Sequence, residues 1–221
     1  MKDLIGTAVV KCTLADGTDI SVVPVEPGTA PEVWRTLRDQ HATTGLWPFL
    51  VDSGDPGFLD RLPLSGGERE YREYHRGAAE IFAEFFGRAG TGREEPVAEE
   101  PAVDRASAVA GTTAIALVAA EWGGVEIPGL LDWDGAPSLS GLEHTAVLAD
   151  WHRRFGAELM TLTGDRIELS VPRPPVEVKE VAAVGMEQAG YCPGVEQGQA
   201  SGWLWCFGWG GGTVGSGYGS G

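Results

Sequence analysis

Apolar and polar residues follow strand-like and helix-like periods in turn along the first part of the chain. Residues 4–11 and 18–25 are β-rich runs on either side of a turn signal, which predicts a hairpin. Residues 31–41 then carry apolar side chains at helical spacing. Residues 68–89 show the longest helical pattern, and its aromatic stripe predicts a helix that faces the core.

Two short apolar runs are the expected centre of a sheet. Residues 47–51 contain Pro48, which has no amide N–H to give to a neighbouring strand, so we expect Pro48 at the start of this strand or on an edge of the sheet. Residues 113–120 are continuously apolar, which predicts a strand buried on both faces. Residues 90–110 are rich in Glu, Pro, Ala and Gly without an apolar period, which indicates an acidic linker or a long exposed loop.

A helix over residues 141–155 has clear signals at both ends. Ser140 is the expected N-cap, Glu143 completes a capping box, and Gly156 is the expected stop. Together with the strands on either side of it, this helix has β-α-β order. If those two strands are parallel, the crossover is right-handed.

The following residues predict a second hairpin and a last helix. Residues 157–161 and 166–171 flank a Thr-Gly-Asp turn. Two prolines precede the helix predicted over residues 176–188, and residues 203–209 form an aromatic strand-like run. We expect the apolar side chains of the helix to point inward, namely Val178, Val181, Ala182, Val184 and Ala189.

These elements predict an α/β protein, with α+β as the alternative: a small mixed sheet with helices packed on it. Residues 1–89 form an N-terminal αβ unit, residues 90–112 an acidic linker or loop, residues 113–207 a unit of β-α-β-β-α order, and residues 208–221 a Gly-rich flexible tail. If the two units share one sheet, the acidic segment is an excursion from that sheet.

An ordered set of short motifs runs through the C-terminal unit. It comprises Trp151, Arg154-Phe155-Gly156-Ala157, the run from Asp165 to Val171, Pro174-Pro175, Tyr191-Cys192-Pro193 and Gln197-Gly198. This set resembles the bacterial family called domain of unknown function 4253, over about residues 114–198. The resemblance implies a compact α/β domain and brings with it no activity and no catalytic residue. The chain departs from the family at Gly194, where an Asp is expected, and in its Gly-rich end.

Charge limits the classes of partner. The formal net charge of −16 disfavours nucleic acid and anionic membranes, because phosphate contacts need clustered Lys and Arg, and it permits a basic protein partner. No apolar run is long enough to span a bilayer, and the N-terminus lacks the features of a signal peptide. We therefore expect a cytoplasmic protein without a membrane partner.

Cysteine and histidine form no metal or cofactor pattern. Cys12, Cys192 and Cys206 are odd in number and widely spaced, unlike a disulfide framework or a zinc site. His144 and His152 share a helix face but stand about 12 Å apart along the axis, too far to share one ion. The sequence contains no P-loop, dinucleotide fingerprint or nucleophile elbow, so we expect no metal and no cofactor.

Two carboxylates near the second hairpin are candidates for acid–base work. Asp165 is explained equally well by hydrogen bonds to turn backbone groups. Glu168 shares a strand face with Arg166, and if that face is covered, Glu168 needs a partner such as Arg154 or Arg166. With the family motifs, the candidate functional residues are Trp151, Arg154, Asp165, Glu168, Cys192 and Gln197.

The missing catalytic signature, the acidic charge and the aromatic residues expected to be exposed favour a non-enzymatic protein-interaction module. One concrete version is an immunity-like or antitoxin-like protein that covers a basic toxin nuclease, with salt-sensitive association. The alternative is a small-molecule binder or enzyme with a pocket near Trp151 and Glu168, lined also by Trp122 and Trp133. Cys192 becomes a nucleophile only if a histidine lies within reach, and is otherwise a buried thiol.

Overall fold

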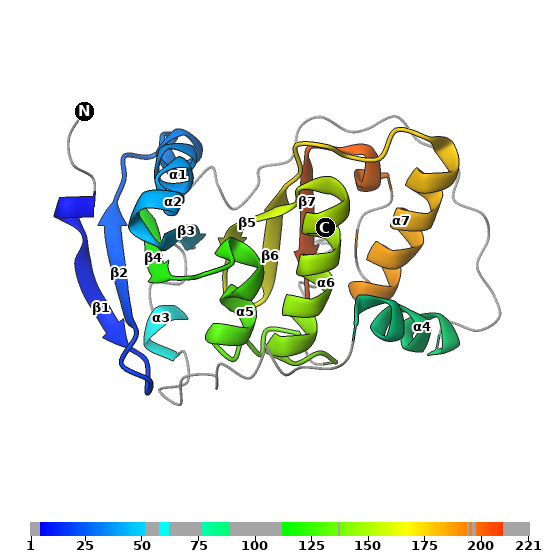
Figure 1. The fold of residues 1–221 in the computed structure, drawn as a ribbon, viewed down its shortest axis with the longest axis horizontal. Coiled ribbons are helices and arrows are strands. Elements are labelled where there is room, and N and C mark those ends of the chain that lie inside the picture. Colours follow the sequence, from blue (N-terminus) through cyan, green and yellow to red (C-terminus); the bar gives the residue numbers. More distant parts are fainter. Residues whose placement is uncertain are drawn as a thin grey trace, which may run out of the picture.

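The computed structural model describes residues 5–51, 58–61, 77–88, 112–136, 138–193, 195 and 198–209. In this part of the chain, helices pack on one seven-stranded sheet of order β1-β2-β4-β3-β5-β6-β7 (Figure 1), which confirms the α/β class. The strands are β1 (Val9–Thr13), β2 (Asp19–Pro24), β3 (Leu46–Val51), β4 (Ala114–Ala119), β5 (Glu158–Leu162), β6 (Arg166–Ser170) and β7 (Leu204–Gly208). The helices are α1 (Ala30–Asp39), α2 (His41–Thr44), α3 (Phe58–Arg61), α4 (Ala78–Arg88), α5 (Ile127–Leu130), α6 (Gly141–Phe155) and α7 (Val178–Tyr191), with 3-10 turns η1 (Ile5–Thr7), η4 (Gly123–Glu126) and η5 (Gln199–Ser201).

Strands from both predicted units belong to this one sheet. β4 comes from the C-terminal unit and lies between β2 and β3 of the N-terminal unit, antiparallel to both. Because β3 is parallel to β5 and antiparallel to β4, β4 and β5 run in opposite directions with β3 between them. The β-α-β order therefore does not form a parallel crossover, and the handedness rule expected from the sequence does not apply.

The interior position of β3 corrects the expectation that Pro48 begins its strand or marks a sheet edge. β3 has neighbours on both sides, but its pairing with β5 is recorded only at Leu50 and Thr161. The carbonyl oxygen of Pro48 accepts a hydrogen bond from Trp34 Nε1 at 2.9 Å. In a strand, the backbone N and C=O of one residue point to the same side. Pro48 has no N–H to donate on that side, and there the Trp34 indole, not a neighbouring strand, binds its carbonyl oxygen.

Helix α6 begins and ends as predicted. Ser140 Oγ accepts from the backbone N–H of Glu143, and the Glu143 carboxylate accepts from the N–H of Ser140 at 2.9 Å. Such a cap is worth about 1 kcal/mol. Gly156 ends the helix with φ of 68°, a left-handed conformation that glycine adopts at low cost.

Two other helices differ from their predictions. α4 spans Ala78–Arg88 rather than residues 68–89, while residues 62–76 and 89, including Tyr71 and Tyr74 of the aromatic stripe, lie outside the described residues. α7 begins at Val178, whose side chain is 83% exposed rather than inward. The buried face of α7 carries Val184, Gln188 and Tyr191, at the i, i+4 and i+7 spacing of a helix stripe, and Val178 and Ala182 are exposed.

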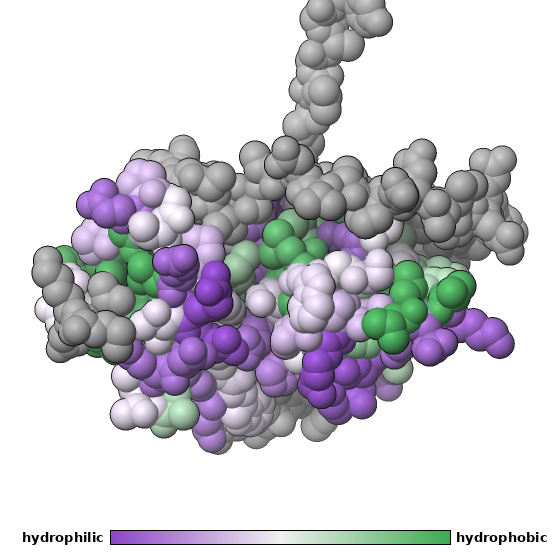
Figure 2. Space-filling view, turned by 90° about the horizontal axis from the view of Figure 1, so that it is seen from above, coloured by the Kyte–Doolittle hydropathy of each residue, from purple (hydrophilic) through white to green (hydrophobic). Residues whose placement is uncertain are grey.

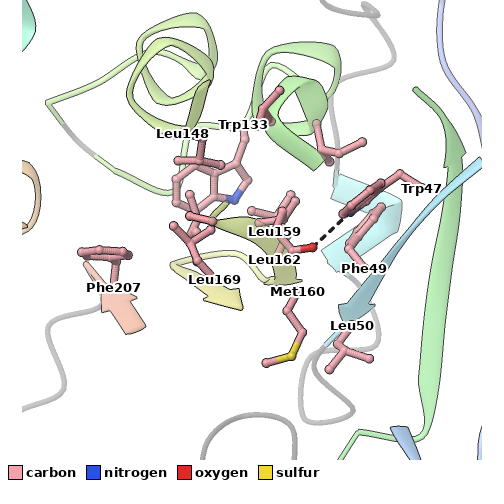
Figure 3. Packing of buried hydrophobic residues seen from close by; sticks show 14 of the residues in the cluster. Trp47, Phe49, Leu50, Trp133, Leu148, Leu159, Met160, Leu162, Leu169 and Phe207 are labelled. Carbon is pink, nitrogen blue, oxygen red and sulfur yellow. Dashed lines mark hydrogen bonds between the residues drawn. The ribbon is translucent and has the colours of Figure 1, made fainter. Parts of the chain in front are cut away.

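The sheet has a front face, which α6 covers, and a back face. Figure 3 shows Trp47, Leu159 and Leu169 on the front side with Trp133, and Leu50 and Met160 on the opposite side. Cα partners across paired strands share a face, so the row Leu50, Thr161, Glu168 and Cys206 lies on the back. Trp205 and Phe207 are front residues, since both contact Trp151 of α6.

Trp47 anchors the front face beside η4. Its indole Nε1 donates to the carbonyl oxygen of Leu159 at 3.0 Å, the dashed line in Figure 3. The backbone of Gly124 lies against the same ring: a Cβ added to Gly124 would stand 2.7 Å from Trp47 Nε1 and 2.8 Å from Leu159 Cβ. Only a residue without a side chain fits there.

Replacement of Gly124 by Ala is therefore expected to destabilise the fold by about 1–3 kcal/mol through overpacking. Gly185→Ala is the matched control, because Gly185 lies inside α7 with no atom within 4 Å of an added Cβ. That change should stabilise by about 0.5–1 kcal/mol through helix propensity. Urea unfolding of the two variants and the parent measures both effects, and equal effects of the same sign would contradict the close approach at Gly124.

Candidate functional site

Trp151 and Arg154 meet at the contact between α6 and α7. The Trp151 indole N–H donates to the carboxylate of Glu187 at 3.0 Å, and Arg154 Nη1 binds both oxygens of that carboxylate at 2.9 and 3.0 Å. Arg154 also binds Asp150 at 3.0 Å, within its own helix. Burial opposes the Arg154 charge, but the hydrogen bonds that Arg154 donates to Glu187 and Asp150, together with their negative charges, outweigh it and raise the pKa of Arg154. Trp151 and Arg154 of α6 both bind Glu187 of α7, so both residues have the structural role of joining these two helices.

Asp165 lies exposed in the β5–β6 turn. Its Oδ1 accepts from Thr163 Oγ1 at 3.3 Å, and its carbonyl oxygen accepts from the backbone N–H of Trp209 at 2.9 Å. These contacts fix the turn and attach the end of β7 to it.

Glu168 lies fully buried on the back face of the sheet. Its carboxylate accepts from Thr161 Oγ1 at 2.7 Å, and Arg166 Nη1 stands 3.7 Å from the other oxygen. Of the two expected partners, Arg166 is present, while Arg154 is engaged by Glu187 and Asp150. Trp151 belongs to the front face, so Glu168 and Trp151 do not line one pocket.

Cys192 follows α7 directly and is buried. Its thiol donates to the carbonyl oxygen of Gly208 at 3.3 Å, which ties the end of α7 to β7. Gln197 lies outside the described residues. The candidate residues of the C-terminal unit therefore fall into separate places: an α6–α7 contact, a turn, the back face and a helix end.

The structure assembles a different group of aromatic residues on the front side, which we call the His144 cluster: Trp133, His144, Tyr191 and Trp209. His144 Nδ1 lies 2.5 Å from the hydroxyl of Tyr191. The imidazole ring centre is 4.7 Å from that of Trp133 and 5.4 Å from that of Trp209, both edge-on. Sequence reasoning missed this cluster because its members come from α6, α7, the end of β7 and the loop before α6.

Both titratable members of the cluster are held neutral. Burial lowers the pKa of His144 to about 3, since the imidazolium would lose its hydration. Burial, with a smaller contribution from Cys192, raises the pKa of Tyr191 well above its ordinary value. The cluster therefore offers neutral hydrogen-bonding groups at physiological pH.

Two ring nitrogens of the cluster have no hydrogen-bond partner among the residues that the structure describes. They are His144 Nε2 and Trp209 Nε1, and both atoms are buried. A buried polar atom without a partner costs about 1–3 kcal/mol, so such atoms are rare in folded proteins and need an explanation, such as an ordered water, an ion or a ligand. The Trp133 indole differs, because its N–H donates to the carbonyl oxygen of Thr163 at 2.7 Å.

Glu126 of η4 is a further buried polar residue that the sequence did not single out. One carboxylate oxygen accepts from the backbone N–H of Trp122 at 3.2 Å, and the other has no hydrogen-bond partner within the described part of the chain. Within the described ranges, no three His, Cys, Asp or Glu side chains group as metal ligands, and no helix has both the length and the apolar character needed to cross a bilayer.

Comparison with known proteins identifies one segment. Residues 114–204 match the family model described as Domain of unknown function (DUF4253), from β4 to the first residue of β7. This confirms the resemblance seen in the sequence motifs. No curated protein and no solved structure matches the chain.

The neutral state of His144 makes stability depend on pH. With a pKa of about 3 in the folded chain and about 6.5 in the unfolded chain, the unfolded state binds the extra proton between these values. The free energy of unfolding therefore falls as pH falls below 6.5, and His144 contributes about 2 kcal/mol of this loss between pH 7 and pH 5. We expect His144→Gln to shrink the difference in unfolding free energy between these two pH values by that amount.

Urea unfolding at pH 7 and pH 5 measures this difference. His152→Gln, at an exposed position of the same helix, controls for the loss of a histidine as such. An undiminished pH dependence in His144→Gln would rule out a buried neutral imidazole at this position.

Proposed function

We propose that this chain, whose residues 114–204 belong to the DUF4253 family, is a non-enzymatic protein-interaction module that binds a basic protein partner. The observation that carries the proposal is the exposure of three large apolar side chains, Val176, Val178 and Trp203, which we call the valine–tryptophan surface. The exposed fractions of these residues are 83%, 83% and 69%. Large apolar side chains gathered on a surface mark interaction sites more often than isolated ones do.

The residues of this surface come from neighbouring segments. Val176 and Val178 lie at the start of α7, and Trp203 directly precedes β7. The carbonyl oxygen of Trp203 accepts from the N–H of Val171 at 2.9 Å, and η5 packs against α7. In the view of Figure 2, hydrophobic residues are exposed on the α7 side of the molecule next to strongly hydrophilic ones.

Acidic side chains outnumber the one basic side chain beside the valines, since Glu177, Lys179 and Glu180 are all exposed. Glu177 stands between the two valines and Glu180 follows within the first turn of α7, and both are exposed. Interfaces commonly combine an apolar centre that carries most of the affinity with a charged rim that steers the partner. An acidic rim on a chain of net charge −16 selects a partner with a basic rim.

The buried state of the reactive side chains supports an interaction role over catalysis. Glu168 and Cys192 are both fully buried, and each is hydrogen-bonded to a group of the protein. A catalytic acid or nucleophile must reach a substrate atom within hydrogen-bond distance. In its most specific form, the proposal makes the chain an immunity-like or antitoxin-like protein that covers a basic toxin nuclease.

The double variant Val176→Ser/Val178→Ser is expected to weaken binding of the partner by about 30-fold, the effect of losing about 2 kcal/mol of apolar contact at an interface centre. The partner is first isolated with N-terminally tagged chain from lysate of the source cells, and the dissociation constant is then measured with purified proteins. Val9→Ser/Val10→Ser is the matched control, because these valines are also exposed but lie on β1, at the other end of the sheet.

A second variant tests the charges of the rim, Glu177 and Glu180, separately from the apolar contacts. Glu177→Gln/Glu180→Gln should slow association and reduce its dependence on salt, while dissociation changes little. An acidic partner, or equal binding by the β1 control and the α7 variant, would overturn the proposal.

A further inference from the structure

The unpartnered nitrogens of the His144 cluster have a definite donor character. If the Tyr191 hydroxyl donates to His144 Nδ1, the imidazole proton lies on Nε2 and one N–H lacks an acceptor. If Nδ1 donates instead, the Tyr191 hydroxyl hydrogen and the Nε2 lone pair both lack partners. The first arrangement leaves fewer buried groups unsatisfied and is therefore the more stable one. His144 Nε2 and the Trp209 indole nitrogen are then both N–H donors without an acceptor.

The surroundings of these donors are flat and apolar. Trp133, Tyr191 and Trp209 surround the imidazole, with ring centres 4.7 to 5.4 Å from it. Trp209 is only half-buried and is attached to the β5–β6 turn through its backbone N–H, whereas Trp133 and Tyr191 are buried and their polar atoms are hydrogen-bonded. Trp209 is therefore the least buried side chain of the cluster.

We propose that the His144 cluster is a binding site for a small, planar, uncharged compound whose carbonyl oxygen accepts hydrogen bonds from His144 and Trp209. Aromatic walls with a few polar groups are typical of small-molecule sites. The ligand is uncharged because Trp133, Tyr191 and Trp209, the rings around His144, offer no counter-charge, and a carboxylate would lose its hydration among them. The net charge of −16 also repels anions.

This site goes beyond the proposed interaction role and lies away from its surface. His144 lies near the start of α6 and Tyr191 at the end of α7, whereas Val176 and Val178 lie at the start of α7. In Figure 1, α7 starts near the top of the view and its other end lies lower, beside α4. Failure of one proposal therefore leaves the other intact.

The test uses the full chain labelled with ¹⁵N-tryptophan, whose eight Trp residues give eight indole N–H signals in a proton–nitrogen correlation spectrum. Trp209→Phe identifies the Trp209 signal by its loss. Benzamide is the probe, toluene provides the same ring without the carbonyl, and benzoate provides the same shape with a negative charge. We expect benzamide to move the Trp209 signal with a dissociation constant on the order of a millimolar, and both comparison compounds to bind at least about tenfold more weakly.

The variants separate hydrogen bonding from packing. Trp209→Phe keeps an aromatic wall and removes the indole N–H, so benzamide binding, followed by titration calorimetry, should weaken about two- to tenfold. His144→Phe should have an effect of similar size, and Trp209→Phe still decides the question if His144→Phe does not fold. Val176→Ser/Val178→Ser should leave benzamide binding unchanged.

Any one of four results would overturn the site. The first is no benzamide shift up to its solubility limit, and the second is equal binding of toluene and benzamide. The third is unchanged benzamide affinity in Trp209→Phe. The fourth is a high-resolution crystal structure in which one buried water satisfies both nitrogens and benzamide added to the crystal does not replace it.

Discussion

The packing of the Trp151 indole holds the C-terminal half of the molecule in place. Its ring stacks on Phe207 at 5.3 Å and meets Trp205 and Tyr191 edge-on at 5.4 and 5.1 Å. Each such aromatic pair adds about 0.5–1.5 kcal/mol to the area it buries. Trp151 thus positions α6 against β7 and against α7, and its indole N–H donates a hydrogen bond to Glu187 of α7. The placement of Tyr191 follows from this contact, and Tyr191 in turn positions the ring of His144.

Local signals in the sequence predicted the local structure well. Ser140, Glu143 and Gly156 marked both ends of α6 because capping depends on residues within one turn. The place of β3 between β4 and β5 was not predictable in this way, since strand order depends on contacts between residues far apart in the chain. The His144 cluster was missed for the same reason: its aromatic members carry no shared spacing that separates them from ordinary core residues. The exposure of Val178 was missed because the partners of α7 decide which of its apolar residues are buried.

The family match omits strands that lie inside and at the edge of the sheet. Its strands β4 and β5 are not neighbours, because β3, from residues outside the match, lies between them and pairs with both. The C-terminal bound of the match, Leu204, also excludes Trp205 and Phe207, the two β7 residues that pack on Trp151. The matched segment on its own therefore lacks a central strand and most of an edge strand. Its core is completed by the residues on either side.

The buried polar groups separate structural from functional residues. Glu168 is buried beside Thr161 and Arg166, so its carboxylate has partners within the sheet. The hydrogen bond from Thr161 and the charge of Arg166 offset the cost of removing this carboxylate from water. His144 differs, because its bond to Tyr191 uses one ring nitrogen and leaves the other without a partner in an apolar surrounding. An apolar residue of similar size would avoid that cost. The unpaired Nε2 is thus the feature on which the proposed ligand site depends, and the half-buried Trp209 is the least buried of its neighbours in the cluster.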